Sequence, residues 1–375
     1  MPDFAPEEYA QRVARAQDGM ARAGIDALLV TTEAELRYFT GFRTAFWQSP
    51  TRPWFLVLPA RGQPIAIIPT IGVALMAATG LTDIRPFDSP APDAPHIPIL
   101  RQALAGVGTI GMPMGAESAL RMPLAEFEAL RASLRADWVD ATPLIRGLRM
   151  IKSPAEQQAL RDICTIGSRA FARAPELFHI GQPLEAAFRA FRIALLQDGA
   201  EEVPYLVGAA DQGGYGDVIS PPSGRPLAEG DILMLDTGAS KLGYFCDFDR
   251  NWAIAHASPR AMDAHARLFA ATEAALAALR PGMTAAALHA VMAQSLGHAS
   301  AVGRLGHGLG MQLTEWPSLA PHDDTILRPG MVLTLEPSLE IAAGKMMVHE
   351  ENVLLTEDGV ELLSARTPPD LPVIG

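Results

Sequence analysis

Apolar and polar positions alternate between helical and strand-like periods in the first part of the chain. Residues from Glu7 to Ala23 repeat with a helical period and stop at Gly24, a residue suited to a helix C-terminus. Short apolar runs predict strands at Ala27 to Val30, Trp54 to Leu58, Ile65 to Ile68 and Gly106 to Gly111, and a further helix at Pro123 to Arg135. This alternation predicts a compact α/β domain over residues 1–149.

A different pattern begins near residue 150. Ser153, Pro154 and Glu156 have the order of a capping box with proline at the first helical position, so a helix is expected from there to about His179. Further helices are predicted from Pro183 to Asp198, Pro259 to Ala278 and Thr284 to Leu296, and strands from Asp231 to Ala239, Gly243 to Ile254, Met331 to Leu339 and Lys345 to Thr356. Strands grouped with helices in this way predict an α+β domain over residues 150–375.

Charge and composition narrow the possible partners. The formal net charge is −12, which argues against a nucleic-acid surface and against docking on an anionic membrane. No apolar run reaches the roughly 18 residues that a membrane span needs, and the first residues lack the basic and apolar regions of a signal peptide. With only two cysteines, Cys164 and Cys246, the chain is expected to work in the cytoplasm without a disulfide framework.

Four carboxylates lie within apolar segments of the second domain. They are Asp236, Asp247, Glu336 and Glu350. A carboxylate among apolar residues is costly unless it is paired or binds a metal. Any one of them alone would be read as a salt-bridged core residue, but four without matching lysines indicate a shared cation. His307, surrounded by glycines, is a candidate fifth ligand, although a lone histidine of this kind is more often structural.

These residues and their surroundings resemble the family of creatinase, prolidase, aminopeptidase P and methionine aminopeptidase. The matching segments of the second domain are Lys152 to Glu156, Asp236 to Gly238, Gly243 to Arg250, Gly306 to Gly310, Glu336-Pro337 and Glu350 to Thr356. In the first domain the matches are Gly24 to Val30 and Tyr38 to Phe42. The resemblance covers nearly the whole chain and implies a creatinase/prolidase-type N-terminal domain before a catalytic domain with the pita-bread fold.

The resemblance also assigns roles to the five candidate ligands. It implies that Asp236 chelates one metal, that Asp247 and Glu350 bridge two metals, and that His307 ligates the other. It implies for Glu336 both a ligand role and that of proton acceptor for a bound water. Two divalent cations balance four carboxylates and lower the pKa of such a water. Manganese is the first expectation, and the ligand set also suits iron, zinc or cobalt.

Three departures from the family pattern put ordinary Xaa-Pro peptide cleavage in doubt. Peptidases of the family usually carry a second histidine seven residues after the ligand, where this chain has Thr314. Another histidine, expected ahead of the first metal ligand, is absent from Val218 to Pro222, and Val348 or His349 replaces an arginine that usually precedes the last glutamate. The missing histidines contact the substrate carbonyl in those peptidases, so Thr314 is a candidate catalytic residue.

Asp249 is an addition, because the family usually has threonine or serine there. Strand alternation turns Asp249 to the same side as Asp247, and therefore toward the metal site. Its alternatives are a salt bridge with Arg250 or another arginine, or a role as an extra ligand or acid/base group. The same alternation turns Cys246 and His349 away from the site.

For some residues of the first domain, a role in a functional site is the alternative to a structural role. Tyr38, Trp47 and Trp54 are expected to pack in the core, although this domain reaches a partner's site in dimeric relatives. Arg43 and Arg52 are expected to be solvated or ion-paired, with the holding of a substrate carboxylate as the alternative.

Together the patterns predict a metallohydrolase of the Xaa-Pro aminopeptidase or creatinase type that cleaves a C–N bond. Its candidate catalytic residues are Glu336, Asp249 and Thr314, and its substrate is a short peptide or a small charged molecule that is not a peptide. The alternatives are a metal-dependent lyase acting on a small zwitterion, like the dimethylsulfoniopropionate lyases of the family, or a non-catalytic binding module. The resemblance implies a homodimer.

Overall fold

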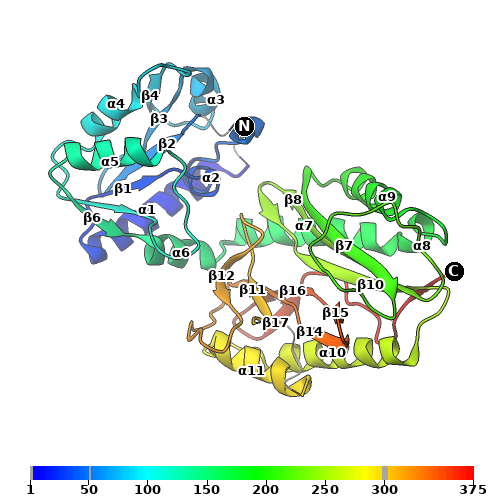
Figure 1. Ribbon diagram of the computed structural model, residues 1–375. Helices are drawn as coiled ribbons and strands as arrows, with labels where there is room; N and C mark the ends of the chain where they lie inside the picture. Colours follow the sequence, from blue (N-terminus) through cyan, green and yellow to red (C-terminus); the bar gives the residue numbers. More distant parts are fainter. Residues whose placement is uncertain (1–2, 50–51, 298–302) are drawn as a thin grey trace. The chain divides into compact units, whose positions relative to one another are not determined.

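The computed structural model describes residues 3–49, 52–297 and 303–375. The chain folds as two compact units, Met1–Arg149 and Met150–Gly375. Figure 1 shows the helices and strands of both units.

The first unit is a mixed six-stranded sheet in the order β4-β3-β2-β1-β5-β6. Its strands are β1 (Ala27–Val30), β2 (Phe55–Pro59), β3 (Ile65–Pro69), β4 (Asp83–Phe87), β5 (Thr109–Met112) and β6 (Asp137–Asp140). Its helices are α1 (Pro6–Ala23), α2 (Glu33–Thr40), α3 (Val73–Ala77), α4 (His96–Ala103), α5 (Leu124–Ser133) and α6 (Thr142–Met150), with 3-10 turns η1 (Ala45–Gln48) and η2 (Thr70–Gly72). The two edge strands, β4 and β6, were not predicted from the sequence, because aspartates and a proline interrupt their apolar pattern.

The aromatic residues of the first unit pack into its interior. Tyr38 and Trp54 are each 1% exposed and Trp47 is 7% exposed. The ring centroids of Trp47 and Trp54 lie 5.7 Å apart, and the Tyr38 hydroxyl donates a hydrogen bond to the carbonyl of Leu148. Core packing, the expected role, accounts for all three side chains.

Arg43 and Arg52, the two arginines with a functional alternative, have local partners. Arg43 forms an ion pair with Asp3 at 3.4 Å, and the guanidinium of Arg52 lies 5.0 Å from the ring centroid of Phe46. The expected ion-paired or surface role therefore describes Arg43 and Arg52.

The second unit has two five-stranded sheets and a hairpin. The first sheet runs β18-β10-β8-β7 with β9 paired to β8, the second runs β12-β11-β13-β16-β17, and β14 pairs with β15. The bounds are β7 (Glu202–Gln212), β8 (Asp231–Lys241), β9 (Tyr244–Phe245), β10 (Phe248–Ile254), β11 (Gly306–Gly308), β12 (Glu315–Ser318), β13 (Val332–Leu335), β14 (Ser338–Ala342), β15 (Lys345–Val348), β16 (Glu351–Leu355), β17 (Val360–Leu362) and β18 (Val373–Ile374).

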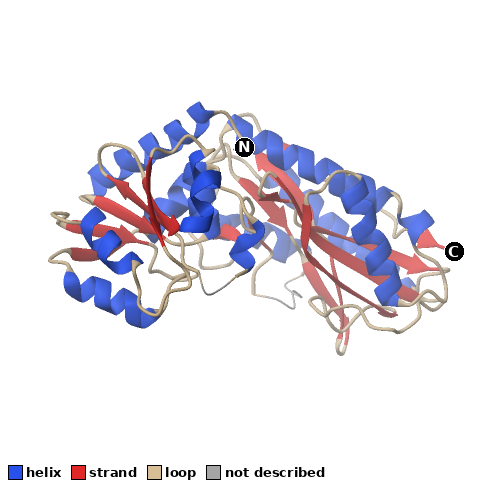
Figure 2. Ribbon diagram, turned by 90° about the horizontal axis from the view of Figure 1, so that it is seen from above, coloured by secondary structure: helices blue, strands red, loops and turns tan. Residues whose placement is uncertain are grey.

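Helices cover the sheets of the second unit from two sides. They are α7 (Pro154–Ala172), α8 (Ala174–Leu177), α9 (Leu184–Gln197), α10 (Pro259–Ala278) and α11 (Ala285–Ser295). Helices α7 and α9 pack on β8 and β7, whereas α10 packs on the hairpin β14–β15. Figures 1 and 2 show this layering, with strands between helices, which is the expected α+β arrangement.

The structure corrects several predicted elements. The helix expected to reach His179 ends at Ala172 and is followed by the short α8, because Pro175 lacks the N–H that a continuous helix needs. Strand β7 was not predicted, since Pro204 and Gly208 interrupt its pattern. Three predicted strands are each broken in two, at residues 246–247, 336–337 and 349–350, and all three breaks contain a candidate metal ligand.

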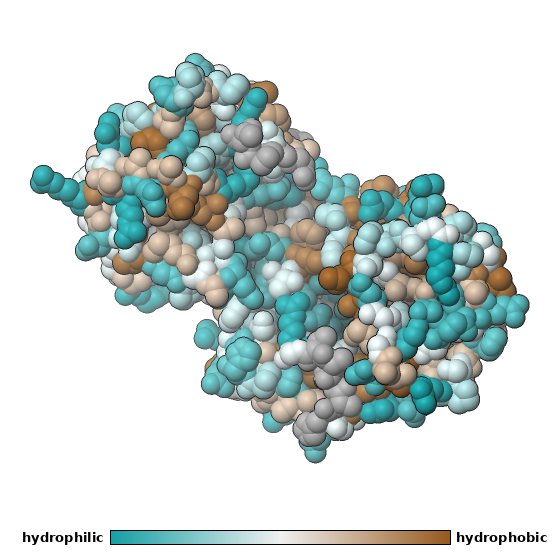
Figure 3. All heavy atoms as spheres, in the orientation of Figure 1, coloured by the Kyte–Doolittle hydropathy of each residue, from teal (hydrophilic) through white to brown (hydrophobic). Residues whose placement is uncertain are grey.

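A membrane-spanning helix is absent from the described part of the chain, where no helix combines the length and apolarity that crossing a bilayer requires. On the face drawn in Figure 3, apolar residues lie in small groups among polar ones.

Candidate metal centre

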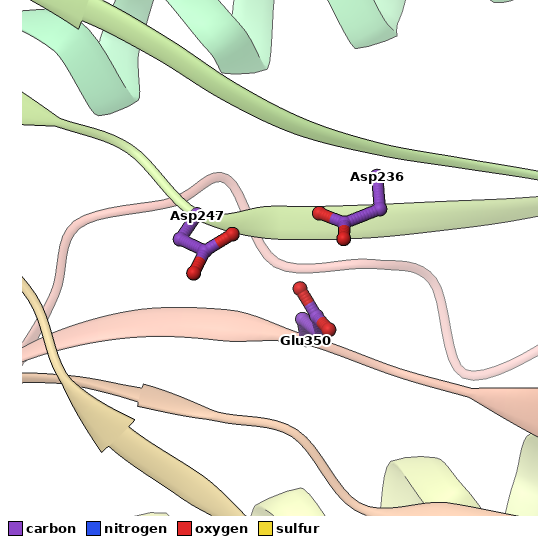
Figure 4. Close-up of side chains that lie close together, drawn as sticks. All are labelled: Asp236, Asp247 and Glu350. Atoms are coloured by element: carbon purple, nitrogen blue, oxygen red, sulfur yellow. The ribbon is translucent and has the colours of Figure 1, made fainter. Parts of the chain in front are cut away.

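Three carboxylates converge in the second unit. Asp236 lies in the middle of β8, Asp247 between β9 and β10, and Glu350 between β15 and β16. One oxygen from each of these side chains lies within 4.8 Å of the other two. Figure 4 shows Asp236 and Asp247 beside one another on neighbouring segments, with the carboxylate of Glu350 approaching from a third segment. All three side chains are buried.

His307 and Glu336 lie beside the three carboxylates. The Nε2 atom of His307 is 3.3 Å from Oδ2 of Asp247 and 3.5 Å from Oε2 of Glu336. On the other side of the ring, Nδ1 is 2.8 Å from the carbonyl oxygen of Gly308 and must donate to it, because a carbonyl only accepts. This contact leaves Nε2 facing the carboxylates, which is the nitrogen that would bind a metal.

The strand breaks position two of the ligands. Glu336 ends β13, and Pro337 behind it cannot continue the ladder, so the chain leaves the five-stranded sheet for the hairpin at this point. The chain returns through Glu350 from the hairpin to β16. The carbonyl of Pro337 accepts a hydrogen bond from His349 N at 3.1 Å, which holds the two crossings together. Both glutamates thus lie where the chain passes between sheets.

Asn352 clamps the backbone of Asp247. Its Oδ1 accepts from the Asp247 N–H at 2.9 Å, and its Nδ2 donates to the Asp247 carbonyl oxygen at 2.5 Å. The hydroxyl of Thr334 donates to the same carbonyl at 3.1 Å. Asn352 and Thr334 are fully buried and lie opposite one another on β16 and β13. These strands therefore satisfy the backbone of Asp247 at a position where it has left the ladder.

The electrostatics of the site fit bound cations. Burial raises the pKa values of Asp236, Asp247 and Glu350 well above the usual range, and the neighbouring carboxylates raise those of Asp236 and Glu350 further. Within the described residues, Oδ1 of Asp236 and Oε2 of Glu350 are buried without a hydrogen-bond partner. A buried oxygen without a donor is costly, and a divalent cation removes that cost. Four carboxylates and one imidazole suit two such cations.

Asp249 lies behind this cluster. It pairs with Asp236 across β10 and β8. Its Oδ1 accepts from the backbone N–H of Glu350 at 2.6 Å, and its Oδ2 accepts from Nδ2 of Asn251 at 2.7 Å. Arg250, proposed as its ion partner, instead pairs with Glu351 at 2.9 Å. These contacts indicate that Asp249 positions Glu350. They differ from the expected roles as a metal ligand or as the ion partner of Arg250.

The five candidate ligands line a cavity of about 220 Å³. Thr314 lines it, as do Val218, Ile219 and Val348 from the other segments that depart from the family pattern. The remaining lining residues were not singled out from the sequence; these are Tyr205, Met234, Arg304, Leu313, Ser338 and Met346. Asp249 is not among the described lining residues. The volume is below the roughly 300–1,000 Å³ of pockets for drug-sized ligands, so the site suits a small substrate.

Tyr205 and Arg304 are, besides Ser338, the polar lining residues that were not predicted from the sequence. Tyr205 lies on β7 opposite Gly238, and burial together with the nearby charge of Asp236 raises the pKa of its hydroxyl. An added Cβ at Gly238 would come within 2.3 Å of Leu313 and 3.0 Å of Tyr205, so glycine leaves room for both. Because β7 was not predicted, its alternation, which faces Tyr205 toward Asp236, could not be used. Arg304 precedes His307 by three residues, and this spacing was the one sequence feature that could have indicated a place near the site.

His349 faces away from the cavity, as strand alternation predicts. Its Nε2 lies 2.8 Å from Nη1 of Arg366 and 3.4 Å from Oε1 of Glu351. The shorter contact requires a neutral ring, because a guanidinium only donates. Burial lowers the pKa of His349 to about 4, despite the opposing effect of Glu351.

Acid is therefore expected to destabilise the second unit through His349. The folded-state pKa of about 4 lies below the ordinary 6.5, so the stabilisation is complete above pH 6.5 and is lost as the pH falls toward 4. A shift of this size corresponds to about 3 kcal/mol. His349→Gln keeps an acceptor for Arg366 and does not titrate, so wild type should lose about 3 kcal/mol relative to this variant between pH 7.5 and 4.

The measurement is urea unfolding of both proteins across that pH range. His256→Gln, at an exposed position of the same unit, is the matched control and should follow the wild-type profile. A free-energy difference between wild type and His349→Gln that stays constant with pH would contradict the assignment.

Comparisons with known proteins agree with this geometry. Residues 158–357 match the family model described as metallopeptidase family M24, and residues 12–151 match the creatinase/prolidase N-terminal domain. A probable dipeptidase PepE of Mycobacterium tuberculosis is 31% identical over 369 residues, covering 95% of this chain and 94% of that protein. The crystal structure of dipeptidase PepE from Mycobacterium ulcerans has a TM-score of 0.86 at 29% identity and covers 99% of both chains.

A further relative is named for a different kind of reaction. An agropine synthesis cyclase of Rhizobium rhizogenes is 28% identical over 396 residues, covering 97% of this chain and 97% of that protein. The matches together confirm the family and the fold class predicted from the sequence. The chain belongs to metallopeptidase family M24 and is a hydrolase with a creatinase/prolidase N-terminal domain and a pita-bread catalytic domain.

Proposed function

We propose that the chain is a dinuclear metal-dependent hydrolase that cleaves the C–N bond of a small amide, such as a dipeptide or an N-acyl amino acid. One observation carries the proposal. Five side chains with metal-ligating atoms, Asp236, Asp247, His307, Glu336 and Glu350, line a single cavity of about 220 Å³. Two of their oxygens are buried without a donor among the described residues. The dipeptidase names of similar proteins support the same reaction class.

Glu336 is the proposed acid/base group. When bound, two divalent cations supply Lewis acidity, which lowers the pKa of a water molecule and polarises the substrate carbonyl. Oε1 of Glu336 is held by Arg304 at 3.1 Å, and Oε2 faces His307. From this fixed position Glu336 accepts a proton from the attacking water and delivers it to the leaving amine. Asp249 holds the backbone of Glu350 and thereby the geometry of that ligand.

Manganese is the first proposed metal, and iron, zinc and cobalt suit the same oxygen-rich set with one imidazole. The cytoplasmic location and the homodimer expected from the sequence stay predictions. Sedimentation of the metal-loaded protein tests the second of them.

A substrate that is not a peptide is the second candidate. Thr314 lines the cavity at the place of a histidine that the peptidases usually carry, and His307 is the one histidine among the described lining residues. A relative with 28% identity is named a cyclase, and this name supports a reaction other than peptide cleavage. A lyase acting on a small zwitterion belongs to this candidate, and a binding module without catalysis is the third.

A turnover screen of the metal-loaded protein separates these candidates. We expect release of free amine from dipeptides or N-acyl amino acids, and its loss after chelation. Glu336→Gln is the matched variant, because it removes the proton acceptor with little change in shape. An unsaturated product in place of a free amine would assign the lyase, and protein that takes up no manganese or zinc would assign the binding module.

A further inference from the structure

Arg304 brings a positive charge to the metal cavity. It is the one lysine or arginine among the described residues that line the cavity. Its Nε donates to Oε1 of Glu336 at 3.1 Å, and its side chain is 38% exposed, whereas that of Glu336 is 15% exposed. Arg304 is therefore more accessible to solvent than the carboxylate that it contacts.

Charge counting gives this arginine a consequence for substrate choice. The lining carboxylates Asp236, Asp247, Glu336 and Glu350 contribute four negative charges. Two divalent cations would cancel them, and His307 would be neutral when its Nε2 binds a metal. The net charge of the loaded cavity is then the single positive charge of Arg304, which favours an anionic group on the substrate and disfavours a cationic one.

The geometry of the guanidinium suits a carboxylate. Arginine carries five N–H donors in a planar fork that matches the two oxygens of a carboxylate. Within the described residues, the hydrogen bond to Glu336 uses Nε and leaves the terminal nitrogens for another acceptor. Leu313, Met346 and Val348 are apolar residues that line the same cavity. A molecule with a carboxylate at one end and an apolar body fits these surfaces.

We propose that Arg304 is the specificity-determining residue of this site, and that it selects small amides carrying a free carboxylate by binding that carboxylate with its terminal nitrogens. The inference rests on the proposed hydrolase function and names its substrate class. Amides without a carboxylate, and cationic amines or sulfonium compounds, are discriminated against by the same residue.

The first test compares Ala-Pro with its C-terminal amide in the manganese-loaded protein. A charged hydrogen bond is worth about 1.5–3 kcal/mol, which is roughly 10–100-fold in an equilibrium constant. Wild type should prefer Ala-Pro by this factor in kcat/KM. In Arg304→Gln the preference should vanish, because KM should rise for Ala-Pro and not for the amide, whatever the common change in kcat. Arg304→Lys should recover part of the preference, because it keeps the charge without the fork.

A purely structural role of Arg304 predicts a different result. If the arginine acts only by holding Glu336, Arg304→Gln should lower kcat equally for both substrates, and that outcome would overturn the proposal. Arg328→Gln, an exposed arginine of the same unit outside the cavity, is the matched control and should leave both parameters unchanged.

Binding measurements keep the inference testable if no amide is turned over. Calorimetry with L-proline and L-prolinamide on the manganese-loaded protein needs no catalysis. Tighter binding of L-proline that is lost in Arg304→Gln would support the role of Arg304 even if the hydrolase function failed. Equal binding of both probes to wild type would overturn the inference while leaving the hydrolase function to the turnover screen.

Discussion

Asp247→Asn should lower the turnover of the metal-loaded enzyme by on the order of 1,000-fold or more, because a bound cation contributes several kcal/mol of transition-state stabilisation. The same variant should change the melting temperature in opposite directions without and with metal. Without metal, the variant removes a buried charge whose pKa is raised by burial, so its melting temperature should rise by about 2–4 °C per kcal/mol gained. With metal, wild type gains about 2.7 kcal/mol at a hundredfold excess over Kd, and the variant should lose most of that gain.

Thermal unfolding measures the change in melting temperature in both conditions, once with chelator and once with manganese. Asp358→Asn, an exposed carboxylate in the turn between β16 and β17, is the matched control and should behave like wild type in both conditions. If Asp247→Asn lowered the melting temperature without metal, repulsion and desolvation would not dominate the empty cluster, and the metal assignment would lose its main energetic support.

Arg250→Met should destabilise the metal-loaded protein by about 3–5 kcal/mol, the usual cost of leaving one member of a buried ion pair without its partner. Nη2 of Arg250 lies 2.9 Å from Oε2 of Glu351, which is fully buried. Nη1 donates to the carbonyl oxygen of Glu350 at 2.8 Å. Because this contact holds the backbone of a candidate metal ligand, the variant should also bind manganese about 10–100-fold more weakly.

Arg366→Met is the matched comparison for Arg250. Arg366 pairs with the other oxygen of Glu351 at 2.9 Å, but its side chain is 20% exposed, against 9% for Arg250. Its loss should cost about 1–2 kcal/mol and leave the manganese affinity within about threefold of wild type. Urea unfolding and manganese titration of both variants test the pair. An Arg250→Met protein within about 1 kcal/mol of wild type would show that Arg366 alone compensates Glu351.

Long apolar patterns predicted most of the core of the second unit. The helices at Pro183 to Asp198 and Pro259 to Ala278 and the strand from Asp231 agree with α9, α10 and β8 within a few residues. Their periods are long and regular, so burial on one face specifies them locally. Strands β4, β6 and β7 were missed because polar residues, proline or glycine interrupt them, and only their pairing with neighbouring strands makes them strands.

The identity of the five candidate ligands came from the sequence, since a carboxylate in an apolar segment needs a partner wherever the chain folds. The resemblance to the metallopeptidase family came from the same residues and their neighbours, and it supplied the fold class. Both conclusions depend on local composition and order.

The arrangement of the site was decided by the tertiary structure. Continuous strands were expected through Asp247, Glu336 and Glu350, but each residue lies at a break where the chain leaves its ladder, and hydrogen bonds from distant residues hold it there. Because the strand is interrupted at Asp247, strand alternation could not predict the position of the Asp249 side chain. Asp249 accepts a hydrogen bond from the backbone of Glu350. Strand pairing likewise brought Tyr205 to Asp236, and the turn into β11 brought Arg304 to Glu336. Contacts between segments far apart in sequence are invisible to local periodicity, so the ligands could be read from the chain, whereas the residues that hold them and line their cavity required the fold.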